Sequence, residues 1–102
     1  MKKKLEVIVL PKPHNRKEFK QSLNFLTEGL QNYCSSLKTN ESEDGLTFTI
    51  LARWDTTDQM RKALRSEEFL ILSGAITALC EKISIRLNDK TVGDHVSKLK
   101  SL

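Results

Sequence analysis

Two segments of the chain carry the clearest hydrophobic patterns of β-strands. Residues 5–10 are a short, β-branched apolar run closed by Pro11 and Pro13, which predicts a strand mostly buried on both faces. In residues 46–54, apolar and polar positions alternate, as they do in a strand with one buried face. The apolar face of that strand comprises Leu46, Phe48, Ile50, Ala52 and Trp54.

Two further segments complete the strand prediction. Residues 35–42 contain one clearly apolar side chain, Leu37, and predict a short polar strand. Glu-Asp-Gly follows at 43–45, and Asp-Gly is a strong hairpin signal, so this strand should turn into the next one. Residues 83–87 alternate again and predict the last strand.

The spacing of apolar residues changes to three and four after Asn15, which predicts a helix of roughly 17 residues with one buried stripe. Asn15 is a plausible N-cap for this helix. Phe25 lies well off the stripe, as an exposed aromatic or as part of an interface. The stripe comprises Phe19, Leu23, Leu26, Leu30 and Cys34.

A second helical region follows the strand that ends at Trp54. Thr56 and Gln59 have the spacing of a capping box, which predicts that a helix begins there. Ser66 is expected to be a second cap, with a kink, and the helical stripe then continues to about residue 81. Its members are Phe69, Leu72, Ser73, Ile76, Leu79 and Cys80.

The order strand, helix, strand, strand, helix, strand is that of an α+β, ferredoxin-like βαββαβ fold. It predicts a four-stranded antiparallel sheet with the helices on one face. The other face mixes polar side chains with residues such as Leu51 and Ile8, which suits an interface with a second copy and predicts a homodimer. We expect one domain over 1–102, with a core of 3–88. The tail 89–102 carries Val96, Leu99 and Leu102, which could form one or two amphipathic turns, docked on a partner or frayed.

Composition and charge narrow the class of protein. The 102 residues carry a net charge of +4, but acids are interspersed among the bases, so we expect no nucleic-acid partner. No run approaches the ~20 apolar residues of a membrane span, so we expect a cytoplasmic protein with no membrane contact. Cys34 and Cys80 are expected to be reduced and packed.

The sequence contains few residues arranged for chemistry. There is no GxSxG, no GxGxxG and no P-loop, so neither a serine triad nor a nucleotide motif is indicated. His14 and His95 lie in polar segments, and no ligand cluster predicts a metal, flavin or haem, so we expect no cofactor. The single tryptophan, Trp54, is either a core aromatic or one wall of a ligand cavity.

Two stretches resemble the antibiotic biosynthesis monooxygenase (ABM) domain family. One is Leu5-Glu6-Val7-Ile8-Val9, followed by Lys12-Pro13 and a helix with Lys17-Glu18-Phe19. The other runs from Arg53-Trp54-Asp55-Thr56-Thr57-Asp58 to Leu64-Arg65-Ser66-Glu67-Glu68-Phe69. In that family the third strand ends in a Trp, a hydroxyl residue caps the next helix, and a Leu-x-Ser turn precedes a Phe. The resemblance covers residues 3–88.

The resemblance implies a dimeric α/β barrel. Some members are cofactor-free monooxygenases acting on phenolic or quinol substrates, others degrade haem, and many have no known activity. This chain has Ala52 where a Glu is common and Glu68 where a His is common. At the positions that match the Asn, Trp and His of the haem-degrading branch it has Val7, Ala63 and Ser73, so haem degradation is set aside.

Three hypotheses follow. The first is a cofactor-independent monooxygenase acting on a small aromatic or quinol-type substrate, with no catalytic residue assigned. The second is a non-enzymatic small-molecule-binding protein with the same fold, and the third is a structural dimer or interaction module. The ligand-pocket candidates are Trp54, Phe48, Phe69 and Ile50, and Trp54 is expected at the edge of an apolar cavity between sheet and helices.

Overall fold

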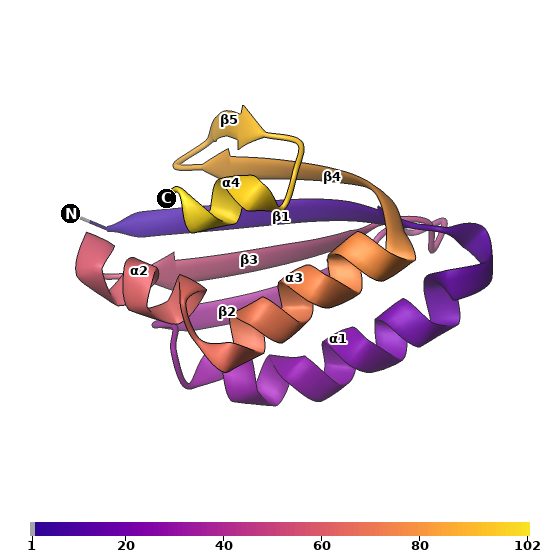
Figure 1. Cartoon of the computed structure of the whole chain (residues 1–102), viewed down its shortest axis with the longest axis horizontal. Helices are drawn as coiled ribbons and strands as arrows, with labels where there is room; N and C mark the ends of the chain where they lie inside the picture. The colour runs from indigo at the N-terminus through magenta and orange to yellow at the C-terminus, as the bar shows by residue number, and fades with distance from the viewer. Residues whose placement is uncertain (1) are drawn as a thin grey trace.

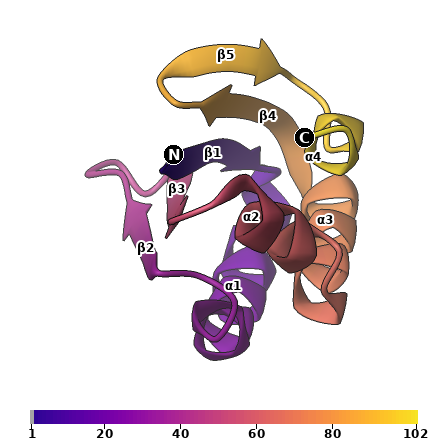
Figure 2. The same ribbon diagram turned by 90° about the vertical axis from the view of Figure 1, so that its left-hand side faces the viewer.

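The computed structural model describes residues 2–102 and contains an antiparallel sheet in the order β2-β3-β1-β4-β5. Figure 1 shows the helices packed along this sheet, and Figure 2 shows that they lie on the same side of it. In chain order the elements are β1 (Lys3–Pro11), a 3₁₀ turn η1 (Pro13–Asn15), α1 (Arg16–Gln31), β2 (Ser36–Glu41), β3 (Phe48–Trp54), α2 (Thr57–Leu64), α3 (Glu67–Leu79), β4 (Cys80–Leu87), β5 (Lys90–Gly93) and α4 (Ser97–Lys100).

The core lies between the helices and one face of the sheet. Alternate residues of β1, namely Leu5, Val7 and Val9, are buried there, and their neighbours on the strand are only partly buried. The central strand β1 pairs with β3 on one side and β4 on the other, so its side chains have neighbours from both adjacent strands. The predicted stripe of α1 supplies Phe19, Leu23, Leu26 and Leu30 to the same core, all buried.

Two of the three predicted cap residues form side-chain hydrogen bonds at the start of their helices. Gln59 N–H donates to Thr56 Oγ1 at 3.1 Å, and the Gln59 side chain accepts from the Thr56 backbone, which completes the predicted capping box. Phe69 N–H donates to Ser66 Oγ at 3.3 Å, so Ser66 caps α3. Asn15, in contrast, makes no side-chain cap bond, because the chain enters α1 through the 3₁₀ turn η1.

The boundaries of the second helical region also differ from the prediction. The region is divided into α2 and α3, which are separated by Arg65 and Ser66. Helix α3 ends at Leu79 and β4 begins at Cys80, so the last predicted strand starts three residues earlier than residue 83. Strand β3 begins at Phe48, and Leu46 stays exposed in the turn that contains Gly45, whose φ of +72° a glycine adopts without strain.

The prediction of four strands was wrong, because the tail contains a fifth strand, β5, that pairs with β4. The β4–β5 turn places Asn88 and Asp89 at φ values of +49° and +68°, a left-handed conformation that Asn and Asp tolerate better than most residues. Asn88 Oδ1 accepts from the backbone N–H of Lys4 at 2.9 Å, and the Asn88 N–H donates to Lys4 O, also at 2.9 Å. Leu99 of α4 is buried in the core, so the tail docks on its own sheet and helices.

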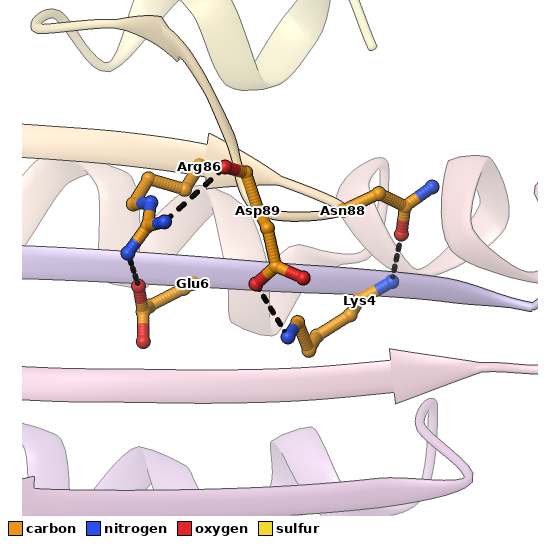
Figure 3. A network of polar contacts seen from close by, with 5 residues as sticks. All are labelled: Lys4, Glu6, Arg86, Asn88 and Asp89. Carbon is orange, nitrogen blue, oxygen red and sulfur yellow. Dashed lines mark hydrogen bonds and ion pairs between the residues drawn. The ribbon is translucent and has the colours of Figure 1, made fainter.

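The open face of the sheet is polar at one end and apolar in its middle. Arg86 Nη1 lies 3.1 Å from Glu6 Oε1, and Lys4 Nζ lies 2.6 Å from Asp89 Oδ1, as Figure 3 shows. Leu51 lies in the same row as Glu6 and Arg86, and the following rows carry Ile8 and Leu10; all three of these apolar side chains are partly exposed.

Candidate functional site

Trp54 ends β3 with its indole directed into the helix side of the sheet. Only 1% of its surface is exposed. Its Nε1–H donates to the carbonyl oxygen of Tyr33 at 2.8 Å, which ties the strand to the loop after α1. A buried indole N–H needs an acceptor, and this contact supplies one.

The four predicted pocket residues are all buried, and the structure brings two of them together. The ring centroids of Trp54 and Phe69 are 6.3 Å apart, with the rings tilted by 46°. Phe48 lies at the other end of β3, where it meets Phe19 edge-on at a centroid distance of 5.6 Å. Ile50 lies between them on the same face of the strand and is 2% exposed.

A cavity of about 380 Å³ adjoins Trp54, between the loop after α1 and helix α2. Phe48, Ile50 and Phe69 are not part of its wall. Its lining is therefore more polar than the sequence predicted. The lining residues are Asn32, Tyr33, Cys34, Ser35, Trp54, Gln59, Lys62 and Ala63.

A second hollow of about 560 Å³ lies along α2 and shares two residues with the first, Tyr33 and Lys62. Both side chains are exposed, so a ligand in either hollow can reach them. Lys62 forms no ion pair among residues 2–102. Its ammonium group is therefore available to a phenolate or carboxylate oxygen of a ligand.

Cys34 stands in the wall of the first cavity as a neutral thiol. Burial raises the pKa of Cys34 from its ordinary 9.0 to about 11, and the nearby indole of Trp54 lowers it by less. Because the thiolate is the nucleophilic form, this side chain is unreactive near neutral pH. Cys34 therefore acts as a packing residue in this wall.

Tyr33 and Glu68 form a pair beside the same cavity. The neighbouring carboxylate of Glu68 raises the pKa of Tyr33, so the phenol stays protonated. Glu68 Oε2 is buried without a hydrogen-bond partner among the described residues. The carboxylate lies over Gly29 of α1, where a Cβ would come within 3.2 Å of Glu68 Cγ. Neither Tyr33 nor Lys62 could be recognised as a site residue from the sequence, since each is a lone polar residue at a helix end or on a helix surface.

The structure resembles solved structures across most of its length. A protein from Mycobacterium tuberculosis, Rv0793, superposes with a TM-score of 0.79 at 16% identity, covering 85% of this chain and 92% of that one. A structure named antibiotic biosynthesis monooxygenase gives a TM-score of 0.77 at 16% identity, covering 85% and 96%. A protein of unknown function from Bacteroides thetaiotaomicron, described as a possible oxidoreductase, gives 0.76 at 21% identity, covering 84% and 94%.

These comparisons establish the fold of the chain. It is the α+β fold of the ABM structures, as the resemblance of the two sequence stretches implied. No family model matches the sequence, and no curated protein matches it.

Two further observations concern metals and membranes. Within residues 2–102, no three His, Cys, Asp or Glu side chains are grouped so that they could hold a metal ion. None of the helices in that range has the length and apolar character needed to cross a membrane. The absence of a cofactor and the cytoplasmic location stay predictions.

Proposed function

We propose that this protein is a cofactor-independent monooxygenase acting on a small aromatic or quinol-type substrate. The observation that carries the proposal is the fold shared with a structure named antibiotic biosynthesis monooxygenase, together with a cavity beside Trp54. About 380 Å³ lies within the range of small-molecule sites.

The reaction would use the electrons of the substrate. A ring C–H or CH₂ carbon that is activated by a neighbouring phenolate reacts with O₂. One oxygen atom becomes the new carbonyl, and the other leaves as water with two hydrogens of the substrate. The balance is R₂CH₂ + O₂ → R₂C=O + H₂O, so no added reductant is needed.

Two side chains of the cavity suit the first step. The ammonium group of Lys62 would stabilise the phenolate and so lower the pKa of the substrate hydroxyl. The protonated phenol of Tyr33, next to Glu68, could donate a hydrogen bond to the oxygen that gains charge. The indole of Trp54 provides an apolar wall.

An oxygen electrode tests this proposal with a panel of quinols, naphthols and anthrones. We expect oxygen uptake that requires the protein, and a loss of roughly tenfold or more in Lys62→Gln. The matched control is Lys17→Gln, which removes an exposed charge from α1. If no substrate of the panel is oxidised faster than in buffer, the proposal fails.

A non-enzymatic small-molecule-binding protein is the second candidate. It is favoured by the burial of Trp54, which is 1% exposed and so leaves little of the indole surface for a ligand. In that case a naphthol would quench the fluorescence of Trp54 saturably without any oxygen uptake. A third possibility, a structural dimer, predicts neither response.

We also propose a homodimer that forms through the open sheet face, with two copies making the barrel. The partly exposed Ile8, Leu10 and Leu51 form an apolar centre, next to the Glu6–Arg86 ion pair. Covering such a centre supplements the stability of a small domain. Light scattering at micromolar concentration should give twice the chain mass, and Leu51→Lys should lower it. A monomeric mass at all concentrations contradicts the proposal.

A further inference from the structure

A cleft of about 490 Å³ lies between α2, α3 and the tail helix α4, away from the residues that line the Trp54 cavity. Figure 2 shows α4 on the helix side of the sheet, next to α3. The cleft lies within the volume range of small-molecule sites. Its lining residues are Arg61, Leu64, Arg65, Leu70, Leu99, Lys100, Ser101 and Leu102.

Leucine side chains form the apolar part of the cleft. Leu64 and Leu99 are 8% and 5% exposed, so they close its base. Leu70 is 50% exposed, although it stands next to the buried Phe69 on α3. An apolar ligand portion in the cleft would cover Leu70 and the partly exposed Leu102.

Cationic side chains border the same cleft. Arg61 and Arg65 stand one turn apart on α2 and its C-cap, and Lys100 ends α4 on the facing side. None of the three forms an ion pair within residues 2–102. One of these three side chains forms a hydrogen bond: Arg61 Nε donates to the main-chain oxygen of Leu102 at 3.3 Å. No acidic side chain is part of the lining.

Two contacts hold α4 in place as a wall of the cleft. A Cβ at Gly93 would collide with Cγ of Lys98, so a larger residue there would force the Lys98 side chain or the start of α4 to shift. His95 Nδ1 accepts from the Ser97 N–H at 3.2 Å, which fixes the turn between them. The wall therefore depends on the close approach at Gly93.

We propose that this cleft binds an amphipathic anion, a molecule with an apolar chain or ring system and one carboxylate. The apolar part would lie on Leu64, Leu70 and Leu99. The carboxylate would pair with Arg61 and Arg65, because a guanidinium group binds carboxylates through parallel N–H donors. The cleft shares no lining residue with the Trp54 cavity, whereas Arg61 and Arg65 also border the second hollow along α2. Occupancy of the cleft does not depend on any oxidase activity.

Calorimetric titration of the full chain with dodecanoate tests the proposal, with dodecanol and dodecyltrimethylammonium as the uncharged and cationic probes. We expect one saturable site for dodecanoate and much weaker binding of the other two. The double variant Arg61→Gln/Arg65→Gln should weaken dodecanoate binding by roughly tenfold or more. The control Lys17→Gln/Lys38→Gln removes the same net charge from exposed positions of α1 and β2, and should change binding by less than about threefold.

The position of the site is tested separately. In NMR spectra of the wild-type protein, dodecanoate should shift the methyl signals of Leu64, Leu70 and Leu99. Gly93→Ala should weaken binding without removing a charge, because it displaces α4. Equal binding of dodecanol and dodecanoate, an unaltered affinity in the double arginine variant, or shifts confined to other residues would each overturn the proposal. A failure to detect oxygen uptake with quinols would not affect the proposal that the cleft binds an amphipathic anion.

Discussion

Replacing Trp54 with Ala tests how the structure holds the end of β3. The indole is 1% exposed, packs against Phe69, and donates a hydrogen bond to the Tyr33 carbonyl. Truncating a buried Trp to Ala costs about 3–5 kcal/mol of unfolding free energy, through lost transfer energy and the cavity that remains. Since a small domain has about 5–15 kcal/mol in total, this one change should remove a large share of the stability.

A second variant separates packing from the hydrogen bond. Trp54→Phe keeps an aromatic ring but leaves the Tyr33 carbonyl without its donor. That carbonyl lies beside the Trp54 cavity, where water can replace the indole, so the lost bond should cost about 1 kcal/mol. With the smaller ring included, we expect about 1–2 kcal/mol for Trp54→Phe.

Urea unfolding followed by far-UV circular dichroism measures both changes, because the variants lack the only tryptophan. Phe25→Ala is the control: this aromatic side chain is 84% exposed, so its loss should cost less than about 0.5 kcal/mol in the monomer. If Trp54→Ala costs under about 1 kcal/mol, or no more than Phe25→Ala, burial of the indole does not determine its contribution to stability.

Three further predictions follow from the caps, the thiols and the tail. Thr56→Ala removes the capping box of α2 and should lower the unfolding free energy by about 1 kcal/mol, and an unchanged urea midpoint would contradict this. Burial raises the pKa of Cys34 and of Cys80 from 9.0 to about 11. At pH 8 their thiolate fractions should therefore be roughly 100-fold below that of a free thiol with a pKa of 9.0, and their reaction with a disulfide reagent should be slower by a similar factor. Because the thiol form is favoured only in the folded state, these two groups should also reduce stability as pH rises from about 9 towards 11. Leu99→Ala should cost about 2–4 kcal/mol and expose the amides of α4 to hydrogen exchange, whereas wild-type exchange rates there would mean that the tail does not depend on Leu99.

The parts of the fold that local patterns determine could be predicted from the sequence. The alternation that ends at Trp54, the stripe that begins at Phe19 and the caps at Thr56 and Ser66 each depend on residues only a few positions apart. Asn15 stands at the N-cap position of α1, as predicted, but after the 3₁₀ turn its side chain accepts no helix N–H.

Strand β5 was missed because its formation depends on contacts distant in sequence. Its turn uses left-handed Asn88 and Asp89 without a glycine, and Asn88 is fixed by Lys4, 84 residues away. Strand β5 has four residues with little apolar signal. The polar members of the candidate site, Tyr33 and Lys62, come together only where the loop after α1 meets helix α2, so their separation in the sequence gives no motif.

Product analysis under ¹⁸O₂ tests the proposed oxidation most directly. An anthrone or quinol that is turned over by the protein should gain one ¹⁸O atom in its new carbonyl, with the second atom recovered as water and no reductant consumed. A parallel reaction in H₂¹⁸O shows whether the new oxygen comes from water, after correction for carbonyl exchange. Label from water, or no product above the uncatalysed rate, would contradict the proposed oxidation.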